Sequence, residues 1–177
     1  TLSGIKILNL HVENGKVESV SVDMGKSQIL TLGGNTTPFV NQPITAKGIT
    51  MNGTAVSMGN PHLVFFVENA EIFDVASVGS AFEHHPWFEN RTNVEFAQIL
   101  SPAKIRMRVW ERGSGITMAC GTGACATFAA AKECGLVNGK TTLVLDGGEL
   151  EIENSSTNGD VIMTGPAQTV FEGKIEI

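Results

Sequence analysis

The sequence has no tyrosine, only two tryptophans and three cysteines, and no apolar run of twenty residues. Three cysteines, spaced five and nine residues apart, do not form a disulfide framework, so we expect reduced thiols in a cytoplasmic protein. Without a long apolar run we expect no membrane-spanning helix. Basic residues number 12 against 18 acidic ones, and the net charge of −6 argues against a nucleic-acid partner.

The 177 residues are enough for about one domain, and strand patterns outnumber helix patterns in the sequence. Two strands meet at the Asn14-Gly15 turn signal, and further strands are predicted at 61–67, 92–100, 104–110, 141–145 and 148–153. One helix is predicted after the N-cap Asp74, with Pro86 as its stop, and a second over 122–134, with Gly135 as its cap. This order predicts an α+β fold with largely antiparallel sheets.

Residues 4–25 resemble residues 148–165: both run glycine, strand, Asn-Gly turn, strand, methionine and a closing glycine. In the second copy, Gly148 lies 28 residues after Cys120. If the match is an internal repeat, a corresponding cysteine and helix would precede Thr1. We therefore expect one complete domain and only the tail of a similar one.

The stretch "ERGSGITMACGTGACATFAAAKECG" (111–135) contains the most distinctive chemistry. Its predicted helix is apolar nearly all round, which is typical of a buried helix wrapped by sheet. Glycines at its start allow backbone N–H groups to bind a carboxylate or phosphate. The positive helix end is also expected to lower the pKa of the Cys120 thiol, which would favour the thiolate.

Two strand ends supply possible partners for this thiol. Glu111 follows three apolar residues on one face of the 104–110 strand, so it is a candidate base on the core side. Arg106 and Arg108 alternate with those residues and are interpreted as an exposed strand face. At another strand start, "GNPH" places Asn60 and His62 on one face.

Some cysteines and histidines have simpler interpretations. A lone cysteine is more often a core residue than a nucleophile, and we assign Cys125 and Cys134 to the core. The adjacent His84 and His85 are interpreted as a solvated helix end, and no metal site is expected.

The segment "ERGSGITMACGTGACA", together with "GNPH" and "RTNVEF", resembles the diaminopimelate epimerase family over essentially the whole chain. The resemblance implies two similar domains, each a largely antiparallel β-barrel wrapped around a central helix. The substrate would bind between them, and two cysteines would exchange a proton with its α-carbon from opposite sides. The implied enzyme is a cofactor-independent isomerase that interconverts LL- and meso-diaminopimelate for lysine and peptidoglycan precursor synthesis.

The resemblance also implies roles for individual residues. Cys120 corresponds to the second-domain catalytic cysteine, and His62 and Glu111 to residues that assist proton transfer. The implied substrate-binding residues are Asn60, Asn93 and Arg112 for the distal groups, and Gly121 and Thr122 for the α-carboxylate.

One departure from the family pattern concerns the first-domain cysteine motif, which this sequence lacks. We expect residues 25–166 to form a complete C-terminal barrel, and residues 1–24 and 167–177 to be remnant strands of the truncated N-terminal domain. The chain alone is then expected to be inactive or impaired and to need that missing domain. Its unpaired strands predict a possible homodimer or strand-mediated self-association.

Two alternatives remain open. The chain could be a related superfamily isomerase of another carboxylic acid, or a non-catalytic anion-binding or interaction domain. Thiol titration separates catalysis from binding, because a catalytic Cys120 is expected to react well below the pH at which a free thiol ionises, near 8.5.

Overall fold

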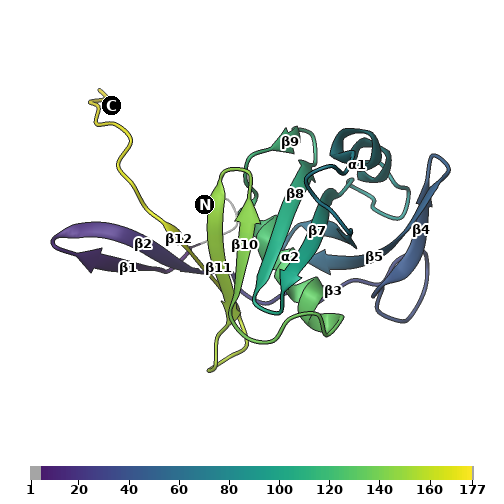
Figure 1. Ribbon diagram of the computed structural model, residues 1–177, viewed down its shortest axis with the longest axis horizontal. Coiled ribbons are helices and arrows are strands. Elements are labelled where there is room, and N and C mark those ends of the chain that lie inside the picture. Colours follow the sequence, from purple (N-terminus) through teal and green to yellow (C-terminus); the bar gives the residue numbers. More distant parts are fainter. Residues whose placement is uncertain (1–4, 177) are drawn as a thin grey trace.

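The computed structural model describes residues 5–176 and contains a compact body from which a β-hairpin and the C-terminal tail project (Figure 1). The helices are α1 (Val75–Glu83) and α2 (Gly121–Glu133). The strands are β1 (Leu8–Glu13), β2 (Lys16–Asp23), β3 (Gln28–Ile29), β4 (Gln42–Ala46), β5 (Ile49–Ser57), β6 (Pro61–Phe66), β7 (Asn93–Ser101), β8 (Lys104–Glu111), β9 (Gly115–Thr117), β10 (Thr141–Leu145), β11 (Gly148–Asn154) and β12 (Val161–Pro166). Within this described range, no helix is long and apolar enough to cross a membrane.

All these strands belong to one strongly curved sheet, in the order β1-β2-β12-β11-β10-β8-β7-β6-β5-β3. Strand β4 pairs with β5, and β9 pairs with β8. The pairs β6–β7 and β8–β10 are parallel and the other recorded pairs are antiparallel, which confirms the predicted largely antiparallel α+β fold.

Helix α2 is the central element of the larger core, and it contacts β5, β6, β7, β8, β10, β11 and β12. Residues 123–131 are all buried, as the apolar sequence of this segment predicts. Most of these side chains are alanine or glycine, so the surrounding strands can approach the helix closely. Phe128 and Met107 fill the larger spaces of this core.

Helix α1 packs on the other face of β7 and β8. Its predicted N-cap is confirmed, because Asp74 accepts a hydrogen bond of 3.0 Å from the amide of Ser77. Gly79 is required where Trp110 crosses the helix, since a Cβ there would lie 2.4 Å from the Trp110 Cβ.

The interpretation of both helix-end histidines as solvated is wrong for His85. His84 is exposed, whereas His85 is buried and its ring lies 4.8 Å from that of Trp87. The Trp87 amide donates to His85 Nδ1, and burial lowers the pKa of this imidazole.

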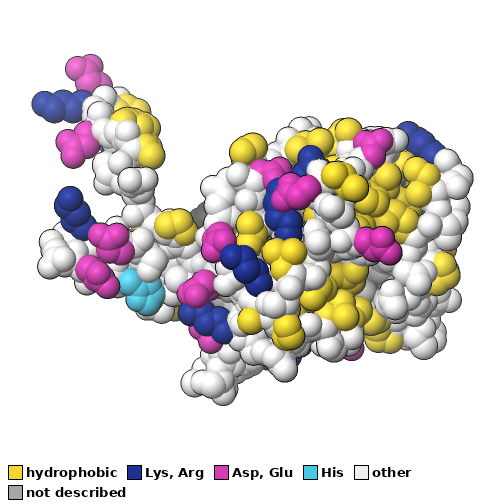
Figure 2. Space-filling view, viewed as in Figure 1, with side chains coloured by type: hydrophobic (Ala, Val, Ile, Leu, Met, Phe, Trp, Pro, Cys, Tyr) yellow, Lys and Arg dark blue, Asp and Glu magenta, His cyan; other side chains and the backbone are white. Residues whose placement is uncertain are grey.

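The two similar hairpins lie side by side, because β2 pairs with β12. The predicted turn at Asn14-Gly15 is confirmed, and both residues have positive φ, of 50° and 77°. Strand β1 forms one edge of the sheet. The apolar side chains of β1, of the two residues Ile5 and Ile7 before it and of the C-terminal tail are exposed. Figure 2 shows hydrophobic atoms on the surface of the projecting tail. The exposed residues of β1 and the tail are Leu8, Leu10, Val12, Val170, Phe171 and Ile175.

The two end segments, residues 1–24 and 167–177, were predicted to be remnant strands of a second domain. Strands β1 and β2 occupy the first of these segments, whereas residues 167–176 contain no helix or strand. Residues 1–4 and 177, which the same prediction includes, lie outside the described range.

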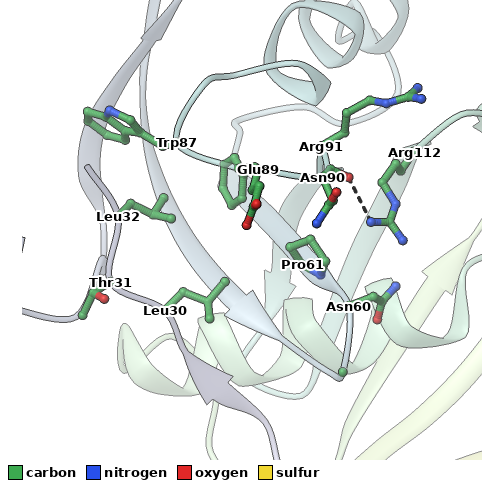
Figure 3. Close-up of a pocket in the computed structure, with 12 residues that line it drawn as sticks. Leu30, Thr31, Leu32, Asn60, Pro61, Trp87, Glu89, Asn90, Arg91 and Arg112 are labelled. Atoms are coloured by element: carbon green, nitrogen blue, oxygen red, sulfur yellow. Dashed lines mark hydrogen bonds between the residues drawn. The ribbon is translucent and has the colours of Figure 1, made fainter. Parts of the chain in front are cut away.

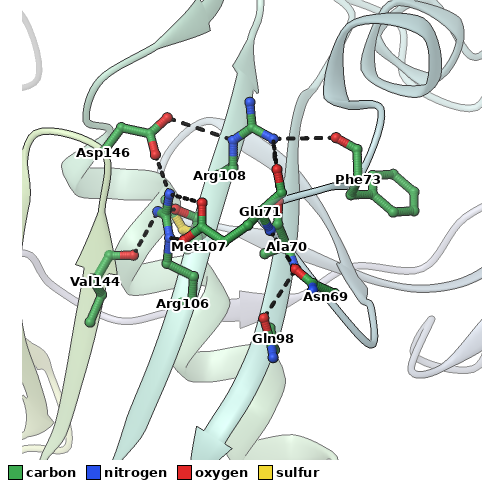
Figure 4. Close-up of polar contacts among 10 residues, drawn as sticks. All are labelled: Asn69, Ala70, Glu71, Phe73, Gln98, Arg106, Met107, Arg108, Val144 and Asp146. Carbon is green, nitrogen blue, oxygen red and sulfur yellow. Dashed lines mark hydrogen bonds and ion pairs between the residues drawn. The ribbon is translucent and has the colours of Figure 1, made fainter.

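The interpretation of Arg106 and Arg108 as an exposed strand face is wrong. The Arg106 side chain is only 10% exposed and binds both oxygens of Glu71, the carboxylate of Asp146 and the carbonyl oxygen of Val144 (Figure 4). We call Arg106, Arg108, Glu71 and Asp146 the Arg106 cluster. It joins β8 to the end of β10 and to the segment before α1, so the loops cover a face that the sequence pattern leaves open.

Candidate functional site

Cys120 is the N-cap residue of α2. Its backbone is extended (φ −141°, ψ 106°), and its Sγ accepts a 3.3 Å hydrogen bond from the amide of Gly123. The Thr122 hydroxyl lies 3.7 Å from the same sulfur. The side chain is 7% exposed, so the thiol sits where the sequence predicts, at the mouth of a buried helix.

The expectation of a stabilised thiolate is wrong for this structure. Burial raises the pKa of Cys120 to about 12, and the negative charges of Glu95 and Glu111 add to the effect. The Thr122 hydroxyl and the Gly123 amide act in the opposite direction and are outweighed. Cys120 is therefore a protonated thiol at neutral pH, which suits it to donate a proton.

The first two amides of α2 are available to a ligand. Within residues 5–176, the N–H groups of Gly121 and Thr122 make no recorded hydrogen bond to protein oxygen, as expected for the first turn of a helix. Both residues are half-buried, beside the Cys120 thiol. Free amides at the positive end of a thirteen-residue helix form an anion-binding arrangement.

His62 and Glu95 form a buried hydrogen-bonded pair on the adjacent parallel strands β6 and β7. His62 Nδ1 lies 2.6 Å from Glu95 Oε1, and both side chains are 0% exposed. Burial raises the pKa of the Glu95 carboxyl, and the attraction of His62 only partly offsets this. Glu95 was not among the predicted site residues, although a glutamate among the apolar residues of "NVEFA" is a detectable signal.

Asn60 connects this pair to helix α2. Its Oδ1 lies 3.2 Å from His62 Nε2, and its Nδ2 lies 3.4 Å from the Thr122 hydroxyl. The structure thus brings four of the predicted site residues, namely Asn60, His62, Cys120 and Thr122, into one connected group.

Glu111 lies at the end of β8, on the strand face that packs against α2. The Thr117 hydroxyl donates a 2.5 Å hydrogen bond to its Oε1, and the residue is half-buried. Glu111 alternates along β8 with Met107 and Val109, which belong to the core around α2, and its charge adds to the raised pKa of both Cys120 and Glu95. The predicted core-side position of Glu111 is therefore confirmed.

Asn93 and Arg112 define the outer part of the site. Asn93 is buried, its Oδ1 accepts from the Arg112 amide, and its Nδ2 donates to the Pro61 carbonyl, both at 3.0 Å. The Arg112 guanidinium is held by the Asn90 carbonyl. Asn93 thus fixes the turn that carries Arg112. Its Oδ1 and its Nδ2 can each make one further hydrogen bond.

A cavity of about 420 Å³ adjoins this region. Figure 3 shows Asn60 and Arg112 on one side of it and Trp87 and Leu32 on the other. Cys120 is not among the residues that line it. The cavity therefore contains the predicted distal-group residues Asn60 and Arg112, while the thiol and the free amides lie outside it.

Comparison with known proteins identifies relatives of the whole chain. The sequence model described as "Diaminopimelate epimerase" matches residues 54–170. A protein named diaminopimelate epimerase from Methanococcus maripaludis is 48% identical over the whole chain, and one from Phocaeicola vulgatus is 51% identical. The chain spans 65% and 64% of the lengths of these two relatives.

Solved structures support the same type of fold. A hydroxyproline epimerase from Agrobacterium vitis superposes with a TM-score of 0.65, over 93% of this chain and 54% of that one. Its sequence is 14% identical, so this likeness concerns the fold alone.

Proposed function

Because the chain belongs to the diaminopimelate epimerase family, we propose that it supplies one half of a cofactor-independent site that interconverts LL- and meso-diaminopimelate. Cys120 is one of two groups that exchange a proton with the α-carbon. The observation that carries the proposal is the Cys120 thiol beside the two free amides at the start of α2.

The α-carboxylate binds at those amides. A carboxylate that accepts from Gly121 and Thr122 lies at the positive end of the helix and places the α-carbon near Cys120 Sγ. Thr122 also offers its hydroxyl, which lies between Asn60 Nδ2 and the thiol. The same residues therefore bind the substrate and aim the thiol.

Inversion requires a base on one side of the α-carbon and an acid on the other. The base takes the α-proton, the C–H electron pair remains on the substrate as a carbanion, and the Cys120 S–H donates its proton to the opposite face. Cys120 then holds the negative charge. Its raised pKa makes protonated Cys120 the resting form for this direction, and the reverse direction starts from the thiolate.

Glu111 and His62 assist these transfers. One oxygen of Glu111 accepts a hydrogen bond from Thr117, and the charge of Glu111 contributes to the raised pKa of Cys120. His62 is connected to the thiol through Asn60 and Thr122. Their role is to set the protonation of the site around the thiol.

Asn60, Asn93 and Arg112 recognise the distal amino and carboxylate groups. Arg112 offers a charged, planar donor for a carboxylate. Asn60 and Arg112 border the same cavity, which is large enough for the distal end of a small amino acid. A substrate extending from the amides of α2 toward this cavity reaches both sets of residues.

The second thiol comes from another domain. Cys125 is fully buried, and Cys134 lies at the far end of α2, about 20 Å from Cys120 by helix rise. We propose that a domain carrying this thiol covers the exposed apolar faces of β1 and the tail, whether in a longer chain, a separate chain or a dimer. We place this reaction in the cytoplasm, where free thiols persist.

The test is exchange of the α-proton of diaminopimelate in D2O, followed by NMR. Exchange that disappears in Cys120→Ser and persists in the matched variant Cys125→Ser supports the proposal. If the chain alone gives no exchange, the assay is repeated with an added domain that carries the second cysteine. Continued absence of exchange would favour the anion-binding interpretation, and exchange of only another carboxylic acid would favour a related isomerase.

A further inference from the structure

Glu95 is a fully buried carboxylate to which neither the family motif nor the proposed mechanism assigns a role. It lies on β7 opposite Val109 of β8, so its side chain faces α2. A buried carboxylate is costly unless its oxygens are bound. Yet Oε2 has no hydrogen-bond partner among the residues that the structure describes.

The Glu95 carboxylate also lies against the start of α2. A Cβ added at Gly123 would lie 2.8 Å from Glu95 Oε1 and 3.1 Å from Cys120 Sγ. The carboxylate and the thiol therefore both rest on the same glycine. This packing indicates that the charge belongs to the site and is not an isolated pair elsewhere in the core.

The hydrogen bonds of His62 determine how many protons the His62–Glu95 pair holds. Nδ1 faces the Glu95 oxygen and Nε2 faces Asn60 Oδ1, while the Asn60 amide nitrogen points to Thr122. Both ring nitrogens thus face oxygen acceptors. Two protons are needed, one on Nε2 and one between Nδ1 and Oε1.

We propose that Glu95 is a positioning residue that keeps a proton on His62 Nε2, directed at Asn60, by sharing a second proton with Nδ1. The pair is then neutral overall, either as carboxylate and imidazolium or as carboxylic acid and imidazole. This neutrality explains how a carboxylate with a free oxygen is tolerated in the core. The raised pKa of the Glu95 carboxyl favours the same proton count.

The consequence is a fixed chain of polar contacts from the core to the thiol. The steps measure 2.6 Å from Glu95 to His62, 3.2 Å to Asn60, 3.4 Å to Thr122 and 3.7 Å to Cys120. Because His62 can only donate toward Asn60, the Asn60 amide is held with its nitrogen toward Thr122. Its relevance to turnover rests on the proposed function, but the proton arrangement does not.

The experiment is 15N NMR of the His62 ring in the whole chain between pH 6 and 9. The other titratable groups whose charges act on or feel the pair are Glu111 and Cys120. His62→Gln identifies the signals. We expect Nε2 to carry a proton throughout in the wild type. In Glu95→Ala, we expect the ring to lose this fixed form and to exchange between tautomers.

Glu83→Gln is the matched control, because Glu83 is also buried but is the last residue of α1, and the His62 ring spectrum of this variant should equal that of the wild type. An unprotonated Nε2 in the wild type, or an unchanged ring in Glu95→Ala, would overturn the proposal. If the chain shows no α-proton exchange, this spectroscopic result still stands or falls independently.

Discussion

Two groups of ionisable residues lie on opposite faces of the same sheet and differ in their burial and in how fully their polar atoms are hydrogen-bonded. In the Arg106 cluster, Arg106 donates to carboxylates and carbonyl oxygens, and Glu71 at its edge is exposed. In the His62–Glu95 pair both side chains are fully buried, and one carboxylate oxygen has no partner within residues 5–176. The first arrangement joins loops to strands, whereas the second places a carboxylate with one unbound oxygen in the core near a thiol.

The difference is also visible in the pKa shifts. Arg106 lowers the pKa of Glu71 by hydrogen bonding, so this carboxylate favours the folded state at neutral pH. Burial raises the pKa of Glu95, which has the opposite effect. A structural cluster is thus most stable in its charged form, while the pair near Cys120 resists full ionisation.

The largest expected effect comes from removing the centre of the structural cluster. Arg106→Met should lower the free energy of unfolding by about 3 kcal/mol, because Asp146 and two carbonyl groups lose their donor in a poorly solvated place. Urea denaturation measures this loss. A change smaller than that of an exposed ion-pair variant, such as Lys104→Met, would show that the cluster is not structural.

High pH should destabilise the core around α2. Burial raises the pKa of both Cys120 and Cys125 to about 12, so above pH 9 the unfolded state loses thiol protons that the folded state retains. The free energy of unfolding should fall by roughly 1.4 kcal/mol per thiol for each pH unit above 9. Denaturation at pH 9 and 10 measures the slope, and a Cys125→Ala variant should halve it.

The two buried glutamates should respond differently to the same substitution. Glu83 accepts from Trp110, Gly113 and Arg91, so Glu83→Gln turns an amide toward donors and should cost about 2 kcal/mol. Glu95→Gln keeps a hydrogen-bonding group beside His62 Nδ1 and replaces a carboxylate that has an unbound oxygen, so it should cost less than about 1 kcal/mol. Equal losses in urea denaturation would contradict the distinction between the two carboxylates.

Acid titration sharpens this pair of variants. Burial acts to raise the pKa of Glu83, but its three donors outweigh burial and lower it, so its stabilisation is lost as pH falls below its ordinary value of 4.5. The raised pKa of Glu95 gives the opposite slope. Stability should therefore fall more steeply in Glu95→Gln than in the wild type between pH 7 and 4.5, and less steeply in Glu83→Gln than in the wild type below pH 4.5.

A small effect is also expected for Gly123→Ala. Alanine favours the helix by about 1 kcal/mol, but its Cβ would lie 2.8 Å from Glu95 Oε1, and such overpacking costs about 1–3 kcal/mol. We expect a net loss of about 1 kcal/mol. Gly121→Ala meets only the flexible Met163 side chain and should be neutral or stabilising, so a loss of equal size there would contradict this account.

The elements that could be predicted from the sequence are those with a strong local pattern of residues. The N-cap at Asp74, the turn at Asn14-Gly15 and the apolar helix around Cys125 were all predicted and confirmed. Strand β5 was missed because Gly53 interrupts its pattern. The structure explains this glycine, since a Cβ there would lie 2.9 Å from the side chains of Leu63 and Phe65.

The electrostatics of the site could not be read from local sequence. The N-terminus of α2 alone predicts an acidic thiol at Cys120, but burial by distant strands and the charge of Glu95 reverse the sign. Arg106 was assigned to solvent by strand alternation, because the loops that cover it come from elsewhere in the chain. Both errors arise from tertiary packing rather than from local pattern.

The most direct test is the pH dependence of Cys120 alkylation by iodoacetamide in a Cys125→Ala variant. Trypsin then separates Cys120 in peptide 113–132 from Cys134 in peptide 133–140, and mass spectrometry measures each rate. With a pKa of about 12, roughly one Cys120 in ten thousand is a thiolate at pH 8, so its rate should be low and still rise through pH 10. A rate that reaches a plateau at or below pH 8.5 would show a thiolate at neutral pH and would contradict the account.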